Sequence, residues 1–204
     1  ISLETNIDFV DTMDYPIVVI LCLYYTFLIV YGYIRNGNSF KGLGDLLRHS
    51  GRLVSDYTVT EGFPMVMINM GILGFVCLIF VFLFFPMING PVLAGMLTVI
   101  SFSGFGKHVK NILPVMLGVT AGYYFLNSTA TPPSFAITVF FFFSLAPISG
   151  RFGALAGFIS GFLILCLVSN IGPAHGGLNL YNTGLSGGII ASALVPILEV
   201  FEKE

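Results

Sequence analysis

Charged residues are scarce in this sequence, and their scarcity excludes an ordinary soluble domain. Asp, Glu, Lys and Arg make up 9% of the 204 residues, hydrophobic residues make up 56%, and the mean hydropathy is +0.94. Soluble domains carry about 25% charged residues. The sequence also lacks a basic patch interleaved with aromatic residues, which argues against nucleic acid as a partner. The expected partner is the lipid bilayer.

Residues for catalysis or metal binding are equally few. The three cysteines lie inside apolar runs without CxxC or Cys/His spacing, and no HExxH, GxSxG or phosphate-loop motif occurs. Gly42–Asp45 matches the GxGD signature of intramembrane aspartyl proteases, which need two aspartates on facing membrane helices. Asp45 lies in a basic polar segment instead, and no apolar run holds a second Asp. We therefore expect no metal, no cofactor and no enzyme activity.

The sequence does contain long hydrophobic runs, separated by polar, Pro-rich or Gly-rich breaks. A bilayer core of ~30 Å takes ~20 helical residues to cross, and the runs lack the alternation of a membrane barrel. The pattern predicts an all-α, polytopic transmembrane helical bundle of about seven hydrophobic runs, two of them short or broken. Val92–Phe105 fits either a tilted span or a re-entrant half-helix. The runs are Tyr15–Ile34, Phe63–Pro86, Val92–Phe105, Ile112–Leu126, Phe135–Ile148, Phe152–Asn170 and Leu185–Phe201.

The polar flanks suggest a topology. Residues 1–14 carry four acidic and no basic side chains and are predicted to be an extracytoplasmic flank, with a single transmembrane domain over 15–204. If all seven runs cross, all eight Lys and Arg fall on one side, which the positive-inside rule makes cytoplasmic. The N-terminus is then outside. The chain begins Ile-Ser-Leu-Glu without Met, which suggests a fragment or a processed product.

The polar segment 35–62 has apolar residues at near-helical spacing. They are Leu43, Leu46, Leu47, Leu53 and Val54. This spacing predicts an amphipathic helix that lies on the membrane surface.

Small residues recur four apart in two of the runs. Gly118 and Gly122 form one such pair, and Gly153, Gly157 and Gly161 form a longer series. Small residues at this spacing let two membrane helices approach closely, so we expect helix packing at these positions.

Two segments, 86–95 and 172–188, break the apolar pattern with Pro, Gly and Asn. They can be laid over one another with Asn89 against Asn182, and each leads into a short apolar run. Irregular backbone at membrane depth must be buried in protein or line a wet cavity, and paired broken segments mark substrate sites in transporters. We therefore predict a site for a solute between them; the alternative is two ordinary outer turns whose asparagines cap helices. The predicted contacts are Asn89, Gly90, Asn179, Tyr181, Asn182 and Thr183.

His108 and His175 are candidates for gating or proton-linked steps, because histidine titrates near neutral pH. The alternative for both is a capping residue or a side chain facing water.

Four stretches of the sequence are distinctive: Leu46–Asp56, Ile68–Gly74, Gly104–Pro114 and Gly177–Gly184. Together they resemble a family of prokaryotic multi-pass membrane proteins known only as a domain of unknown function. The resemblance implies the inner membrane of a prokaryote and members of about twice this length, so that this chain is one half of a tandem, inverted repeat. Gly177–Gly184 is also loosely similar to the pore segments of urea transporters, without positions for that family's phenylalanine slot.

Together these features predict a membrane channel or secondary transporter for a small polar solute, with its site between 86–95 and 172–188. A homodimer, or pairing with a second copy of the repeat, would complete the pathway. The alternative is a non-transporting membrane scaffold or assembly subunit, in which the small-residue helices serve association and the Asn-rich segments are turns.

Overall fold

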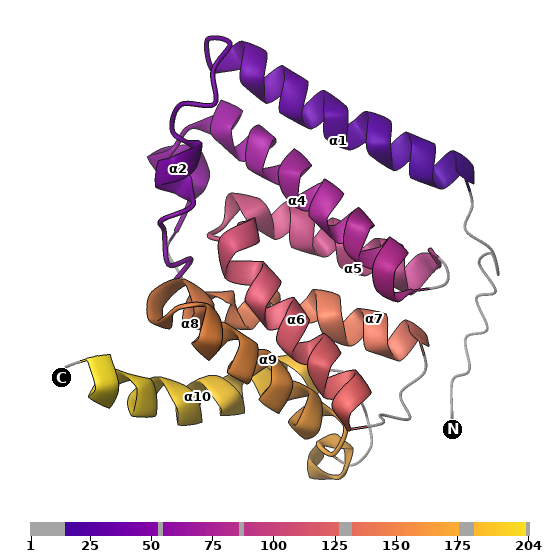
Figure 1. Cartoon of the computed structure of the whole chain (residues 1–204), viewed down its shortest axis with the longest axis vertical. Coiled ribbons are helices and arrows are strands. Elements are labelled where there is room, and N and C mark those ends of the chain that lie inside the picture. Colours follow the sequence, from indigo (N-terminus) through magenta and orange to yellow (C-terminus); the bar gives the residue numbers. More distant parts are fainter. Residues whose placement is uncertain (1–14, 53–54, 86–87, 127–131, 176–181, 203–204) are drawn as a thin grey trace.

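The computed structural model describes residues 15–52, 55–85, 88–126, 132–175 and 182–202, and within these ranges it is a helical bundle without strands (Figure 1). The predicted fold class is therefore confirmed as all-helical. By length and composition four helices could cross a membrane: Tyr15–Arg35, Phe63–Phe84, the broken helix Phe135–Phe152, and Asn182–Glu202. The shorter apolar helices Gly90–Gly104 and Ala154–Val168 accompany them.

Helices α1 (Tyr15–Arg35) and α4 (Phe63–Phe84) pack along each other as an antiparallel pair. Glycines permit the approach: a Cβ on Gly32 would lie 2.5 Å from Pro64 O, and one on Gly71 would lie 2.7 Å from Tyr25 O. The Tyr25 ring is fully buried in this contact. The outer face of α1 remains apolar and exposed, as expected of a helix that faces lipid.

A second layer is built from helices that are short or broken. Helix α5 (Gly90–Ser101) continues as a 3-10 turn, η1 (Phe102–Gly104), and packs on α7 (Pro132–Phe141), where Gly95 approaches Phe140. Helix α7 passes through a second 3-10 turn, η2 (Phe142–Leu145), into α8 (Ala146–Phe152). The predicted run Phe135–Ile148 thus becomes one span with a break near its middle.

Helices α6 (Val109–Phe125) and α9 (Ala154–Val168) cross at the predicted small residues. A Cβ on Gly118 would collide with Phe158 O, and one on Gly161 would collide with Val115 O. The expectation for Gly153 was wrong. Its φ of +91° forms the sharp turn between α8 and α9, so it ends one helix and begins the next.

Helix α10 (Asn182–Glu202) follows a 3-10 turn, η3 (Gly172–His175), and packs against η2, α8 and α9. Only 11% of its most apolar window is buried, which leaves most of the helix exposed.

The predicted amphipathic surface helix in segment 35–62 is wrong where the structure describes it. Only Leu43–Leu46 (α2) and Tyr57–Thr60 (α3) are helical, and Gly51 between them has a φ of +75°. Leu46 and Tyr57 are instead buried against α4, beside Met65, Val66 and Ile68. Leu53 and Val54 lie outside the described residues. Burial against α4 therefore overrides the local helical spacing.

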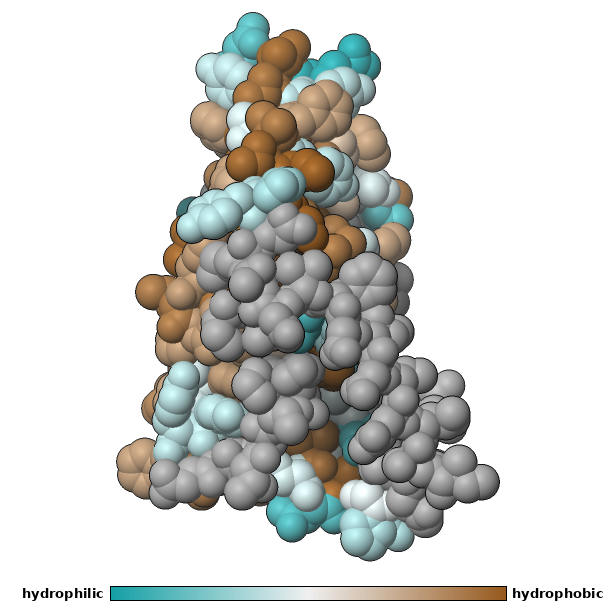
Figure 2. Space-filling model, turned by 90° about the vertical axis from the view of Figure 1, so that its right-hand side faces the viewer, coloured by the Kyte–Doolittle hydropathy of each residue, from teal (hydrophilic) through white to brown (hydrophobic). Residues whose placement is uncertain are grey.

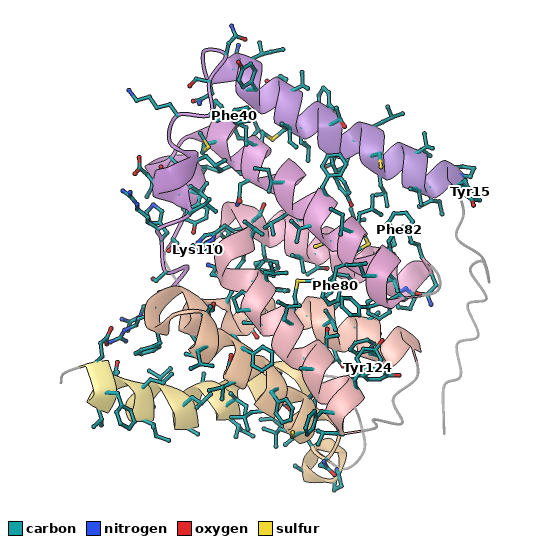
Figure 3. All side chains as sticks on the ribbon, viewed as in Figure 1. Tyr15, Phe40, Phe80, Phe82, Lys110 and Tyr124 are labelled. Atoms are coloured by element: carbon teal, nitrogen blue, oxygen red, sulfur yellow. The ribbon has the colours of Figure 1, made fainter. Side chains whose placement is uncertain are left out.

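The two ends of the bundle differ in charge. Phe40 and Lys110 lie at one end, with α2, α8 and the C-terminal end of α10, whereas Tyr15, Phe82 and Tyr124 lie toward the other (Figures 1 and 3). We call the first the basic end, because the loops around Arg48, Arg52 and Lys107 gather there. Figure 2 views the molecule from the other end, where the upper part, over α1, is largely hydrophobic.

Candidate functional site

The turn over residues 103–107 at the basic end is held by a buried asparagine of α4. Asn69 is 1% exposed, and its Nδ2 donates to Ser103 O at 2.9 Å and to Lys107 O at 2.7 Å. Helix geometry alone leaves such end carbonyls unsatisfied, so a side-chain donor is needed when they are buried. Asn69 therefore fixes where Lys107 leaves the backbone.

Asn111 holds the same turn from α6. Its Nδ2 donates to Gly106 O at 2.9 Å, and its Oδ1 accepts from the His108 amide at 3.0 Å. The second bond satisfies a free amide at the start of α6, as a helix-capping side chain does. The turn is thus tied on both sides by buried amides.

The loop over residues 48–52 lies against this turn. His108 Nε2 donates to His49 O at 2.9 Å, and the backbones of Gly51 and Gly106 touch so closely that a Cβ on either would collide with the other. Gly150 of α8 meets Ser50 O in the same way. The loop therefore packs between the start of α6 and α8, and this packing sets the position of Arg52. We call the contact between the 48–52 loop and the 103–107 turn the junction.

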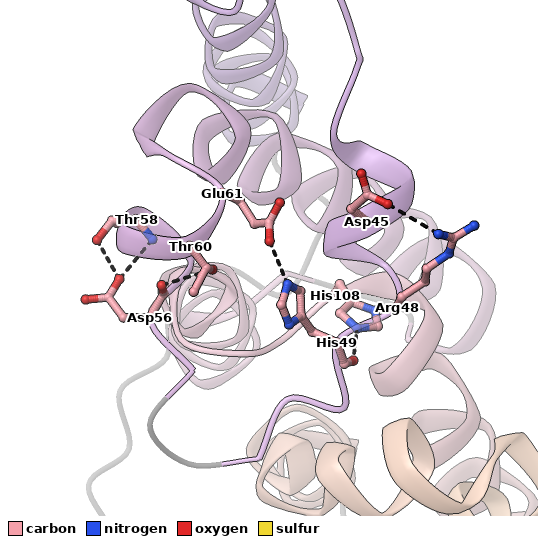
Figure 4. Close-up of polar contacts among 8 residues, drawn as sticks. All are labelled: Asp45, Arg48, His49, Asp56, Thr58, Thr60, Glu61 and His108. Atoms are coloured by element: carbon pink, nitrogen blue, oxygen red, sulfur yellow. Dashed lines mark hydrogen bonds and ion pairs between the residues drawn. The ribbon is translucent and has the colours of Figure 1, made fainter.

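The side chains of Glu61 and His108 lie on either side of His49 at this junction (Figure 4). His49 Nε2 lies 2.6 Å from Glu61 Oε1, and the buried Tyr57 ring lies 5.2 Å from the His49 ring and 6.5 Å from the His108 ring. Burial lowers the pKa of His108, which keeps the imidazole neutral at pH 7, and its Nδ1 is buried without a partner in the described part of the chain. His108 thus serves at least as a structural donor; its predicted role in gating stays a prediction.

A cavity of about 690 Å³ lies beside the junction, between the two loops and helices α8 and α10. This volume is in the range of small-molecule sites. Most of its wall is apolar, and cationic side chains stand toward the basic end. The lining residues are Gly51, Arg52, Phe102, Phe105, Lys107, Phe143, Ser144, Pro147, Ile148, Arg151, Phe152, Ala191, Val195 and Glu199.

The cations of the cavity differ in their partners. Arg151 donates to Glu199 at 2.7 Å and to Glu202 at 2.8 Å, which fastens the C-terminal end of α10 to α8. Lys107 is 7% exposed, and burial lowers its pKa to about 8. No carboxylate of the described residues lies within ion-pair distance of its ammonium group. A desolvated and unpaired cation therefore faces the cavity.

The cavity reaches from the loops to the middle of two spans. Ser144 lies in η2, the break of the α7–α8 span, and Ala191 lies near the centre of α10. Just beyond, a Cβ on Gly187 would lie 3.1 Å from Ser144 Oγ, so α10 and η2 approach closely there. The Ser186 hydroxyl is also buried at this level, without a hydrogen-bond partner in the described ranges. Of α10, only Ala191, Val195 and Glu199 line the cavity, so its lining reaches no farther along this helix than Ala191.

The residues predicted as solute contacts lie elsewhere or only partly within the structure. Asn89 caps α5, with its Oδ1 accepting from the Val92 amide at 3.1 Å, and Gly90 begins that helix. Asn182 and Thr183 begin α10. None of these lines the cavity. Asn179 and Tyr181 lie outside the described residues, and His175 ends η3 with its side chain outside them, so the predicted site stays a prediction.

Asp45 of the GxGD match lies on α2, outside the spans. Its exposed carboxylate pairs with Arg48 at 3.3 Å. Asp45 thus lies outside the four candidate membrane spans, whereas the protease chemistry needs an aspartate at membrane depth.

Sequence reasoning missed the junction and the cavity, although a signal existed. Three of the four stretches that carry the family resemblance, 46–56, 68–74 and 104–114, meet here through Asn69, Gly51 and His108. Distinctive polar residues and glycines in several separate stretches indicate that these stretches meet at one site. The composition and periodicity of each apolar run by itself do not indicate this.

Replacing Asn69 by Leu should destabilise the protein by about 2–4 kcal/mol, because two buried carbonyls would lose their donor. Thermal unfolding in detergent, followed by far-ultraviolet circular dichroism, measures the change. Asn170→Leu is the matched control, since Asn170 also donates to a backbone carbonyl but is exposed. Equal, small effects of both substitutions would contradict the role given to Asn69.

The sequence profile of a family described as "Protein of unknown function (DUF1576)" matches residues 35–200. The match includes the junction, the cavity and α10. No curated protein and no solved structure matches the chain.

Proposed function

The chain belongs to this family of unknown function, and we propose, from its own geometry, that it is a membrane channel or secondary transporter for a small polar solute. The observation that supports the proposal is the cavity, which extends from the basic end to Ser144 and Ala191, at about the middle of their spans. A scaffold has no need of such a hollow, whereas solute sites of transporters lie near the midplane, at broken helices.

We further propose the predicted topology of seven crossings with the N-terminus outside. Successive segments run back and forth between the two ends of the bundle, with α5–η1, α6 and α9 as the shorter crossings (Figure 1). Under the positive-inside rule the basic end faces the cytoplasm of a prokaryotic cell. The cavity then opens toward the cytoplasm and is closed toward the outside.

The remainder of the pathway would follow α10. Beyond the contact between Gly187 and Ser144, one more turn and a half leads to Thr183 and Asn182, at the opposite end of the bundle. These residues, together with Asn89 at the start of α5, are on that end and would receive the solute after the contact opens. The described state corresponds to the inward-open step of alternating access.

The exposed face of α10 supports pairing with a second unit, either another chain or the other half of a longer, inverted-repeat protein. Gly184, Gly188 and Ser192 lie four residues apart on this face and line a shallow hollow with Leu185, Ile189 and Ala193. Small residues at this spacing are typical of helix association. The same observation favours the second candidate function, a membrane scaffold without transport.

Liposome flux separates the two functions. We expect purified protein to raise the flux of at least one solute from a panel of urea, glycine, acetate and benzoate, and Gly187→Leu to reduce it about tenfold or more, because the side chain would fill the contact with Ser144. Gly44→Leu is the control, because a Cβ there meets open space on α2, away from the cavity and from the exposed face of α10. Asn89→Ala with Asn182→Ala tests the predicted outer contacts.

Wild-type flux equal to that of empty liposomes for every solute would overturn the transport function. Normal flux in the folded double asparagine variant would remove those two residues from the pathway while leaving the cavity in it.

A further inference from the structure

Lys107 stands apart from the other Lys and Arg residues that the structure describes. All of those are exposed, whereas Lys107 is buried on the wall of the cavity. A buried ammonium group costs free energy unless a counter-charge accompanies it. The turn that carries Lys107 is nevertheless held firmly by Asn69 and Asn111. The fold therefore holds this cation on the wall of the cavity.

The charges around the cavity leave a positive excess. Arg151 is matched by Glu199 and Glu202, whereas Arg52 and Lys107 form no ion pair within the described residues. The rest of the wall is apolar and aromatic. It is formed by Phe102, Phe105, Phe143 and Phe152, with Ile148 and Val195.

We propose that the cavity binds a small amphiphilic anion, with its carboxylate or comparable headgroup on Lys107 and Arg52 and its apolar body against the phenylalanines. The unpaired ammonium group and the aromatic wall both fit this ligand. The anionic headgroup would form a charge-assisted hydrogen bond with the ammonium group, and the phenylalanine rings would bury the apolar part of the ligand. The inference rests on the proposed function, since it names the class of solute. An anionic lipid offers the same headgroup chemistry, and the experiment separates the two sources.

The test is binding of radiolabelled benzoate to the full chain in nanodiscs of phosphatidylcholine, which supply no anionic lipid. We expect saturable binding that is about tenfold or more weaker in Lys107→Met, because a hydrogen bond to a charged group is lost. Lys107→Arg should retain binding within a few-fold. Lys110→Met is the control, since Lys110 is exposed three residues along the chain and does not line the cavity.

A second set of nanodiscs, containing phosphatidylglycerol, distinguishes the sources. If phosphatidylglycerol abolishes benzoate binding, the site belongs to a lipid headgroup. If benzoate binding is unchanged, the site belongs to the soluble anion. Absence of benzoate binding in the first discs, or equal binding by folded Lys107→Met, overturns the inference.

Failure of this inference and failure of the proposed function give different results. If benzoate binding depends on Lys107 but the liposomes show no flux, the transport function is rejected and the anion site is kept. Flux that does not change in Lys107→Met removes the anion site and leaves transport.

Discussion

Replacing Lys107 by Met should make the protein more stable at neutral pH. The ammonium group is buried without a carboxylate partner, and burial lowers its pKa from the usual 10.5 to about 8. Keeping the group charged inside the fold therefore costs on the order of 3 kcal/mol. Methionine preserves much of the apolar stem and removes the charge. The bond from Asn69 to the backbone carbonyl of residue 107 is unaffected.

The gain should depend on pH in a defined direction. Between pH 8 and 10.5 the unfolded chain holds the Lys107 proton and the folded chain does not, so wild-type stability rises with pH through this window. The advantage of Lys107→Met is then full below about pH 8 and is gone above about pH 10.5. The other charged residues that line the same cavity are Arg52, Arg151 and Glu199.

Thermal unfolding in neutral detergent at several pH values checks this result, and Lys110→Met should change it little, because Lys110 is exposed. A Lys107→Met protein that is less stable than the wild type at pH 7 would show that the ammonium group has a stabilising partner. A variant that gains stability and loses benzoate binding would instead show the trade-off that is common at functional sites.

The helical spans could be predicted from the sequence because their cause is local. A run of about 20 apolar residues satisfies its backbone within itself, so Phe63–Phe84 is a helix whatever its neighbours are. The capping of α5 by Asn89 is equally local, because the side chain reaches an amide three residues along the chain.

Segment 35–62 could not be predicted in this way. Leu43, Leu46 and Leu47 have helical spacing, but burial of Leu46 and Tyr57 against α4 and the left-handed backbone of Gly51 decide the structure. These are contacts between distant parts of the chain, and a local pattern carries no information about them.

The cavity could not be predicted for the same reason, because it is formed by contacts between distant parts of the chain. In the sequence Lys107 is one of several basic residues that orient a membrane protein, and nothing beside it indicates burial. Its environment arises only when Asn69, Asn111 and Gly51 bring α4, α6 and the 48–52 loop together. The predicted asparagines, by contrast, were chosen from local breaks in apolar runs, and local breaks locate helix ends more readily than binding sites.

Replacing Gly118 by Val should cost about 3 kcal/mol or more, or prevent folding, because the added side chain would meet the backbone of α9 at Phe158 and Phe162. Gly161→Val tests the same crossing from the other helix, where the obstacle is the backbone at Val115. Neither backbone can move without separating α6 from α9. Because α8 packs on α9, such a movement would also displace α8 and the part of the cavity wall that it forms. Gly44→Val is the control, because Gly44 lies in an open part of α2.

Circular dichroism during heating and monodispersity on size exclusion measure all three variants under one set of conditions. We expect the control to unfold at or slightly above the wild-type temperature, since valine forms helix better than glycine. We expect both crossing variants to unfold well below it. If Gly118→Val and Gly161→Val unfold at the same temperature as the control, α6 and α9 do not cross at these glycines. The α8 wall of the cavity is then not held in place by this crossing.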